Sequence, residues 1–373
     1  MISKVSEINY YIKTNKFKKI AIIAGKKSFN KVNGNKIIKE ITSYTKIEEL
    51  KYFFKINNFP EIEELKKLIY FLETFKPNLI LAIGGGSVID YAKIANVKDI
   101  GQNLIKKIHG VSDIGNKKLA KMIAIPTTAG SGAEVTSGAV IYIKKVKYSI
   151  DNNLIIPDKY FLLPQIIIKN TKKLKASSGF DAISQSIESI ISVKSNNISL
   201  HHAKKSLKIS LGNYLNFIKR PNFYNSSNMS IAAMLAGKAI NISKTTAPHA
   251  VSYPFTSHFN ISHGHAVSLT LEKFLKFNYI NRKKSKTNFN LDNRYKTLFK
   301  IFGIKNINEL NLRIKNLKNQ ANLIDNFKKF KIDINKYYPK ILNEINIKRL
   351  KNNPIQLNKS DIKLILLKNY DEE

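Results

Sequence analysis

The segment that most constrains the fold is NLILAIGGGSVIDYAKIANV, residues 78–97. It joins a short apolar run to three consecutive glycines and then to apolar residues at helical spacing. An apolar run of this length is typical of a strand in a parallel sheet, because both faces of such a strand are covered. The segment therefore predicts a strand, a tight turn and a helix, the repeating unit of α/β folds.

Other segments of the first 170 residues have the same character. Residues 18–25 form an apolar run that ends in glycine, and residues 60–77 show helical spacing between two prolines. A second apolar run enters the turn PTTAGSGAEVT within 121–136, and residues 138–150 alternate like one strand. Strands that alternate with helices indicate a parallel sheet, so we expect a Rossmann-like α/β domain at 1–173.

The periodicity changes to helical from about residue 175 onward, which predicts an all-helical domain at 174–373. The motif GFDAISQSIES (179–189) is expected to open a helix. Beyond about residue 280 the chain is rich in Lys and Asn, with Leu, Ile and Phe at helical intervals. We interpret this part as loosely specified helices without chemistry of their own.

Composition narrows the possible functions. The formal charge is +37, but arginine occurs only at 220, 282, 294, 313 and 349. Specific nucleic-acid recognition favours arginine, and AT-rich coding explains the abundance of Lys and Asn, so we expect no nucleic-acid partner. The chain has no cysteine, so a metal site must use nitrogen and oxygen ligands. The sequence contains no apolar run long enough to predict a membrane span, and this favours a cytoplasmic protein.

The two turns are candidates for a phosphate-binding edge. Glycines let a backbone approach a pyrophosphate, and N–H groups at a helix start attract anions. Neither turn matches the GxGxxG fingerprint or a Walker loop, and each could be a plain tight turn. Together they favour a dinucleotide site, for which the candidates are Gly84, Gly85, Gly86, Ser87, Asp90, Thr127, Thr128 and Ser131.

Four of the seven histidines lie within residues 247–267. Asp181 and Gln185 are four residues apart and therefore share one face of the predicted helix. They are either an N-terminal-turn carboxylate and a solvated amide, or half of a metal site. If His249 and His263 stand at helix ends and face this pair, the set suits Fe²⁺ or Zn²⁺.

These motifs, in this order, resemble those of the iron-containing (group III) alcohol dehydrogenases over about residues 18–275. The resemblance implies an NAD(P)H-dependent oxidoreductase that interconverts aldehydes or ketones and alcohols. It also implies a dehydroquinate synthase-like architecture, and we expect a homo-oligomer. In the family a metal lies in the cleft between the two domains and polarises the carbonyl oxygen during hydride transfer.

Carried over residue by residue, the resemblance implies metal ligands at Asp181, His249 and His263. The family usually has a fourth ligand, a histidine, where this chain has Gln185. His265 is expected near the site without binding the metal, and His258 in a surface loop. Tyr253 stands where the family often has a second histidine near the substrate, and either relays a proton or packs.

The sequence around the histidines is similar to that of enzymes that reduce phosphonoacetaldehyde to 2-hydroxyethylphosphonate. Lys244, Thr245 and Thr246 are candidates for binding the phosphonate; the alternative for Lys244 is one more solvated lysine. Lys147 matches a family lysine near the cofactor. After the first strand, Gly25 is followed by Lys26, Lys27 and Ser28, with no acid to repel a 2′-phosphate, which predicts tolerance of NADPH or a preference for it.

Two other functions fit the same residues. One is a general alcohol or glycerol dehydrogenase-like enzyme of the same architecture. The other is a relative that has lost catalysis, in which Gln185 marks a decayed metal site. Product analysis distinguishes the first, and metal content together with aldehyde turnover distinguishes the second.

Overall fold

The computed structural model describes residues 2–43, 46–57, 59–345 and 347–367. The chain divides into two units, Met1–Asn170 and Thr171–Glu373. Within the described residues, no helix is long and apolar enough to cross a membrane.

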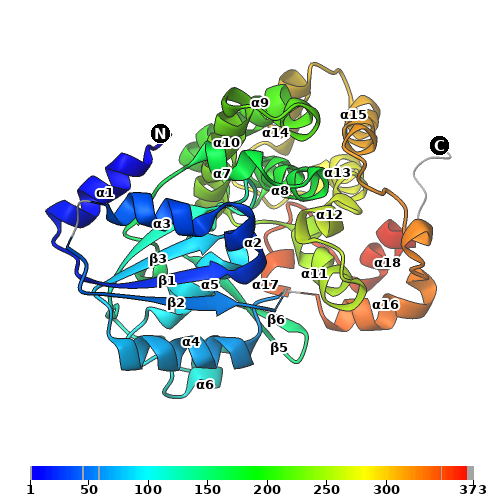
Figure 1. The fold of residues 1–373 in the computed structure, drawn as a ribbon. Coiled ribbons are helices and arrows are strands. Elements are labelled where there is room, and N and C mark those ends of the chain that lie inside the picture. Colours follow the sequence, from blue (N-terminus) through cyan, green and yellow to red (C-terminus); the bar gives the residue numbers. More distant parts are fainter. Residues whose placement is uncertain (1, 44–45, 58, 346, 368–373) are drawn as a thin grey trace. The chain divides into compact units, whose positions relative to one another are not determined.

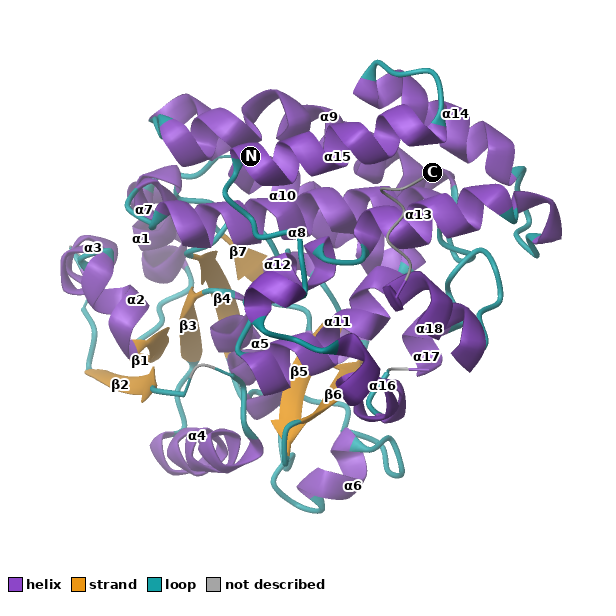
Figure 2. Cartoon of the chain, turned by 90° about the vertical axis from the view of Figure 1, so that its right-hand side faces the viewer, coloured by secondary structure: helices purple, strands orange, loops and turns teal. Residues whose placement is uncertain are grey.

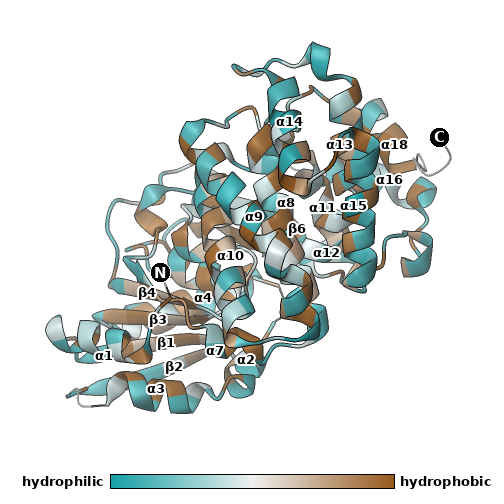
Figure 3. Cartoon of the chain, turned by 90° about the horizontal axis from the view of Figure 1, so that it is seen from above, coloured by the Kyte–Doolittle hydropathy of each residue, from teal (hydrophilic) through white to brown (hydrophobic). Residues whose placement is uncertain are grey.

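The first unit is built on a parallel sheet with the strand order β2-β1-β3-β4-β7 (Figure 1). Its strands are β1 (Lys19–Gly25), β2 (Glu49–Lys55), β3 (Leu79–Gly84), β4 (Lys121–Pro126) and β7 (Lys159–Tyr160). The central strands β1 and β3 are apolar along their length (Figure 3) and buried, because helices cover both faces. The predicted parallel α/β sheet is confirmed, although β2 escaped sequence analysis because exposed polar residues interrupt its apolar pattern.

Seven helices surround this sheet among the described residues. They are α1 (Val5–Thr14), α2 (Lys26–Lys31), α3 (Gly34–Thr42), α4 (Ile62–Phe75), α5 (Gly86–Ala95), α6 (Leu104–Ile108) and α7 (Pro164–Ile168). Alternate side chains of β1 point to opposite faces of the sheet, since a strand has a period of two. Ile20 and Ile22 belong to the core with α1, α2 and α3, whereas Ala21 and Ile23 belong to the core with α4 and α5.

The prediction of one strand at 138–150 is wrong. This segment forms an antiparallel hairpin of β5 (Gly138–Ile143) and β6 (Val146–Asp151), separate from the parallel sheet (Figure 2). Its turn residues Lys144 and Lys145 have φ angles of +49° and +68°. Tight hairpins need this left-handed geometry, but the usual Asn-Gly signal is missing from the sequence, which is why the turn was not predicted.

The described part of the second unit is helical, as predicted. Its main helices are α8 (Lys172–Ile191), α9 (Asn197–Lys219), α10 (Phe223–Ser243), α11 (Ala247–Phe259), α12 (His263–Ser268), α13 (Leu271–Ile280), α14 (Leu291–Phe302), α15 (Ile307–Gln320), α16 (Ile334–Asn343), α17 (Ile347–Leu350) and α18 (Lys359–Leu367). Short 3-10 turns occur at Arg282–Lys284 and Lys328–Phe330 in this unit, and at Ala133–Val135 and Asn153–Ile155 in the first unit.

The motif at 179–189 does not open a helix, which corrects the prediction. Helix α8 begins at Lys172, capped by the Thr171 side chain, so Asp181 lies in its interior. Gly179, the first residue of the motif, continues the helix because packing requires a residue without a side chain: a Cβ there would lie 2.7 Å from the ring of Tyr214. Tertiary contact thus overrides the weak helix propensity of glycine.

Candidate functional site

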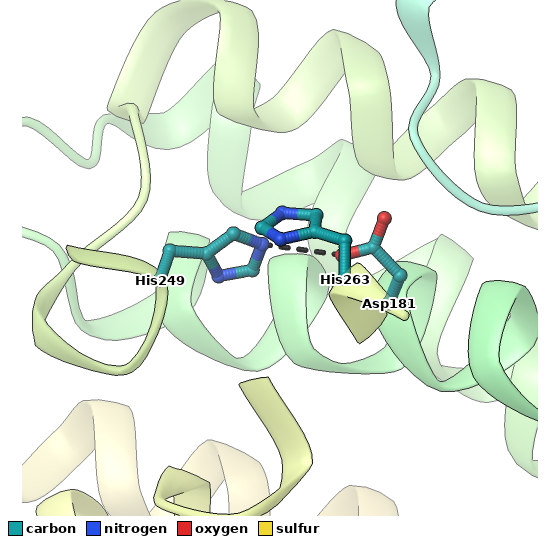
Figure 4. A group of neighbouring side chains, drawn as sticks. All are labelled: Asp181, His249 and His263. Carbon is teal, nitrogen blue, oxygen red and sulfur yellow. Dashed lines mark hydrogen bonds and ion pairs between the residues drawn. The ribbon is translucent and has the colours of Figure 1, made fainter. Parts of the chain in front are cut away.

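Three side chains of the second unit converge on one point. Asp181 lies on α8, His249 is the third residue of α11, and His263 is the first residue of α12. Each offers one ligand atom, and these atoms all lie within 4.8 Å of one another (Figure 4). Asp181 and His249 are buried, and His263 is partly exposed. Both histidines therefore stand in first helical turns and face Asp181, which is the arrangement that a metal site would require.

A close approach of two helices brings His263 to Asp181. A Cβ added to Gly264 would overlap the carbonyl oxygen of Ser177 and lie 2.8 Å from the Cβ of Asp181. The backbone N–H of His265 also donates to Ser177 Oγ at 3.2 Å. Only glycine at position 264 allows α12 to contact α8 this closely, so the glycine in SHGHA has a structural role that the sequence alone did not reveal.

The surroundings of the Gln185 side chain indicate whether the cluster suits a metal. It lies one turn after Asp181 on α8 and is 3% exposed. Its Oε1 is buried and has no hydrogen-bond partner among the described residues. A buried acceptor without a partner is costly unless a ligand satisfies it. Two imidazoles, a carboxylate and an amide oxygen form a nitrogen and oxygen donor set that fits Fe²⁺ or Zn²⁺.

Glu188 orients His249, and sequence analysis did not identify this role of Glu188. The carboxylate is fully buried and its Oε1 lies 2.5 Å from His249 Nδ1. Its Oε2 accepts from the N–H and hydroxyl of Thr246 at 2.7 and 2.8 Å. An acceptor on Nδ1 fixes the ring so that Nε2, 3.2 Å from Asp181 Oδ1, is directed to the cluster. The available signal was spacing: Glu188 follows Asp181 by two helical turns.

Glu188→Ala is expected to weaken metal binding by about 10- to 100-fold, the usual cost of removing a carboxylate that orients a metal-binding histidine. His249 then loses its partner, and the two Thr246 donors are left unsatisfied. Titration of the metal-free protein with Zn²⁺, followed by calorimetry, measures the change. Unchanged affinity in a folded variant contradicts the orienting role. Glu344→Ala, which removes a partly buried carboxylate paired with His258, is the matched control.

The cluster has a strong electrostatic field. Burial lowers the pKa of His249, but Glu188 and Asp181 together outweigh it and raise that pKa to about 9. Burial raises the pKa of Tyr253 to about 12, so its phenol stays protonated at neutral pH. The Tyr253 ring is stacked on His263, with centroids 6.0 Å apart and an interplanar angle of 28°. This contact gives Tyr253 a packing role, which is one of the two alternatives, proton relay or packing, that the sequence left open.

The other two histidines of the segment have structural contacts. His265 is 6% exposed, and its Nε2 lies 2.8 Å from the carbonyl oxygen of Ile324. His258 was expected in a surface loop, which is wrong. It lies in the last turn of α11 and pairs with Glu344 at 2.7 Å, with 14% of its side chain exposed.

The predicted substrate residues Thr245 and Thr246 require a correction. Both are fully buried, and their hydroxyls already have protein partners. Thr246 donates to Glu188, and Thr245 Oγ1 accepts from Arg349 Nη1 at 2.6 Å. Neither hydroxyl is therefore presented to a phosphonate. Lys244, partly exposed, ends α10 with the unusual backbone angles φ +58° and ψ 173°.

In the first unit the two predicted turns lie side by side. Strands β3 and β4 pair so that Gly84 is opposite Pro126, and the N–H of Thr127 donates to the Gly84 carbonyl at 2.9 Å. A Cβ on Gly86 would lie 2.7 Å from Ser131 Oγ, and one on Gly85 would lie 3.4 Å from Thr128 Oγ1. No side chain caps the start of α5. This glycine cradle at an uncapped helix start fits a pyrophosphate.

The remaining cofactor candidates occupy different places in the first unit. Gly25 ends β1, next to β3 in the sheet, and Lys27 is exposed in the following helix α2. Ser87 is partly exposed at the start of α5. Asp90 is 8% exposed, and its Oδ2 accepts the N–H of Val140, so it fastens α5 to the hairpin. Lys147 lies on β6 opposite Tyr142.

Comparison with known proteins identifies the family of the chain. Residues 3–164 match the family model "Iron-containing alcohol dehydrogenase", and residues 175–370 match "Fe-containing alcohol dehydrogenase family, C-terminal". The family binds NAD(P) and a divalent metal. The chain is 30% identical over 207 residues to a 4-hydroxybutyrate dehydrogenase of Clostridium kluyveri, and 28% identical over 218 residues to a phosphonoacetaldehyde reductase of Streptomyces viridochromogenes.

These alignments cover 54% and 56% of this chain, and the chain spans 55% of the length of each relative. The fold is also similar to that of a sulfoacetaldehyde reductase from Bifidobacterium kashiwanohense in complex with NAD⁺. That structure has a TM-score of 0.85 at 22% identity and covers 98% of this chain and 94% of the other. Because the family models match both units over most of their length, the chain belongs to the iron-containing alcohol dehydrogenase family.

Proposed function

We propose that the protein is a metal-dependent NAD(P)H oxidoreductase that reduces a small aldehyde to a primary alcohol. The observation that carries this proposal is the convergence of Asp181, His249 and His263 within 4.8 Å. Gln185 lies one helical turn after Asp181, and its buried Oε1 without a partner supports a fourth oxygen donor beside these three residues. We assign Asp181, Gln185, His249 and His263 as the residues that hold the metal.

A bound Fe²⁺ or Zn²⁺ supplies Lewis acidity toward the carbonyl oxygen, and bound NAD(P)H supplies the hydride, so that aldehyde, hydride and one proton give the alcohol. The protein's residues supply position. Glu188 holds the His249 ring through Nδ1, and Tyr253 holds the His263 ring by stacking. In the first unit, we assign Gly84, Gly85 and Gly86 to the pyrophosphate, with the hydroxyls of Thr128 and Ser131 beside them.

For the cofactor we propose NADPH, because the end of β1 has no acid and Lys27 is exposed directly after it. Lys27→Glu is expected to raise the KM for NADPH by about 10-fold, since a carboxylate would repel the 2′-phosphate, with little change for NADH. Steady-state kinetics with both cofactors measure this. Lys39→Glu on α3 changes the net charge equally and serves as the control. Equal efficiency with NADH, unaffected by Lys27→Glu, contradicts the proposal.

For the substrate we propose phosphonoacetaldehyde, with 2-hydroxyethylphosphonate as the product. The relatives named for phosphonoacetaldehyde and for 4-hydroxybutyrate support an anionic substrate, because each of these compounds carries an oxyanion group. The test is NADPH oxidation by the metal-loaded protein with phosphonoacetaldehyde, propanal and glyceraldehyde, followed by product identification. Turnover of neutral aldehydes alone favours a general alcohol dehydrogenase. The absence of both metal binding and turnover favours a decayed relative.

A further inference from the structure

Arg349 lies in the part of the chain where the sequence showed no chemistry. It belongs to the short helix α17 (Ile347–Leu350) and is partly exposed. Its Nη1 donates to Thr245 Oγ1 at 2.6 Å. Asn352, three residues later, is 5% exposed and its Nδ2 donates to the Thr245 carbonyl at 3.4 Å. Arg349 and Asn352 thus bind Thr245 together, one through its side-chain hydroxyl and the other through its backbone carbonyl.

This contact connects Arg349 to the candidate metal cluster. Thr245 is followed directly by Thr246, which donates twice to the fully buried Glu188. Glu188 in turn lies 2.5 Å from His249 Nδ1. The guanidinium is therefore fixed by the same segment that orients a metal-binding histidine, Thr245–His249. Arg349 also acts electrostatically on the phenol of Tyr253, whose ring stacks on His263.

An arginine at this position is unusual for this chain. Only five of the 63 basic residues are arginines, so lysine is the default cation. Two other arginines use the flat guanidinium for stacking: Arg282 lies over Tyr279 at 4.1 Å and Arg294 over Phe289 at 4.2 Å. Arg220 and Arg313 are exposed. Arg349 is the one arginine of the described residues that contacts the segment next to the metal cluster.

We propose that Arg349 is a specificity-determining residue that binds the oxyanion end of the substrate, and that Thr245 positions its guanidinium. This inference rests on the proposed function and identifies which residue selects anionic aldehydes. A guanidinium has five N–H donors in one plane, so it can hold Thr245 and also form paired hydrogen bonds to a phosphonate, sulfonate or carboxylate. Thr245 and Thr246 therefore support the anion site indirectly, rather than binding the anion themselves.

The experiment compares Arg349→Gln with the metal-loaded wild type, using phosphonoacetaldehyde and propanal as substrates. For phosphonoacetaldehyde the KM is expected to rise about 10- to 100-fold, the range of a lost charge-assisted hydrogen bond. The kcat/KM for propanal should fall by a clearly smaller factor, since a neutral aldehyde has no group for Arg349 to bind. Arg313→Gln, on the exposed face of α15, is the matched control.

Two further measurements separate recognition from folding. Ethylphosphonate should raise the Tm of the wild type but not of Arg349→Gln, a readout that needs no turnover. Thr245→Val keeps the shape but removes the acceptor, and should raise the KM for phosphonoacetaldehyde by a smaller factor than Arg349→Gln. Arg349→Lys keeps the charge but lacks the planar fork, so it should recover only part of the affinity.

The outcomes are distinguishable. Equal loss with both aldehydes in Arg349→Gln would show a merely structural arginine and overturn the inference. An unchanged KM for phosphonoacetaldehyde would overturn it as well. If the metal-loaded wild type reduces neither aldehyde, the proposed function fails, and ethylphosphonate binding then decides whether Arg349 is still an anion site.

Discussion

His249→Ala is expected to lower the affinity for Fe²⁺ and Zn²⁺ by more than about 100-fold, since losing a ligand should exceed the about 10- to 100-fold cost of losing an orienting partner. The kcat/KM for aldehydes should fall by about 1000-fold or more, because stabilisation of the developing alkoxide is lost with the metal. The substitution also leaves Glu188 Oε1 buried without its partner. Metal analysis of the purified variant and steady-state kinetics measure the two effects.

The matched control is His258→Ala on the same helix, α11. His258 pairs with Glu344, whose side chain is 18% exposed, so its loss should cost about 1–3 kcal/mol of stability and leave metal content unchanged. If His249→Ala retains the metal content and activity of the wild type, the assignment of the metal centre is wrong. A loss of metal in both variants would instead indicate general unfolding of α11.

Gly264→Ala is expected to displace α12 from α8 and to weaken metal binding by more than about 10-fold. One methyl group at this position overlaps the Ser177 carbonyl oxygen and crowds the Cβ of Asp181, and both belong to the regular helix α8 and cannot move cheaply. Overpacking of this kind costs about 1–3 kcal/mol in the free energy of unfolding. Because His263 precedes Gly264, the same displacement moves a metal ligand. Urea unfolding and Zn²⁺ titration measure the two losses.

Gly212→Ala is the matched control, since a Cβ there meets nothing within 4 Å. Gly212 lies inside α9, where alanine is the better helix former, so this variant should be more stable by about 0.5–1 kcal/mol. Its metal affinity should equal that of the wild type. If Gly264→Ala behaves like Gly212→Ala, the close approach of α12 does not position His263.

The sequence predicted the parallel sheet because its signals are local. Buried strands such as β3 are continuous apolar runs, and the glycines after them mark turns whatever the rest of the chain does. It failed at the β5–β6 hairpin, where Lys144 and Lys145 adopt positive φ angles without a turn signature. It also failed at the start of α8, where Gly179 continues a helix because Tyr214 packs against it. The first error came from a turn without its usual residues, and the second came from long-range packing that decides a local conformation.

By itself, the sequence identified Asp181, His249 and His263 as candidate metal ligands, because these residues stand in motifs with distinctive neighbours. Only the tertiary structure decided how they are held. Glu188 orients His249, Gly264 brings α12 against α8, and Arg349 reaches Thr245 from 104 residues further along the chain. Spacing along a helix predicts which side chains share a face, but contacts between distant segments depend on how the helices pack. The residues that position the ligands therefore become visible only in the folded chain.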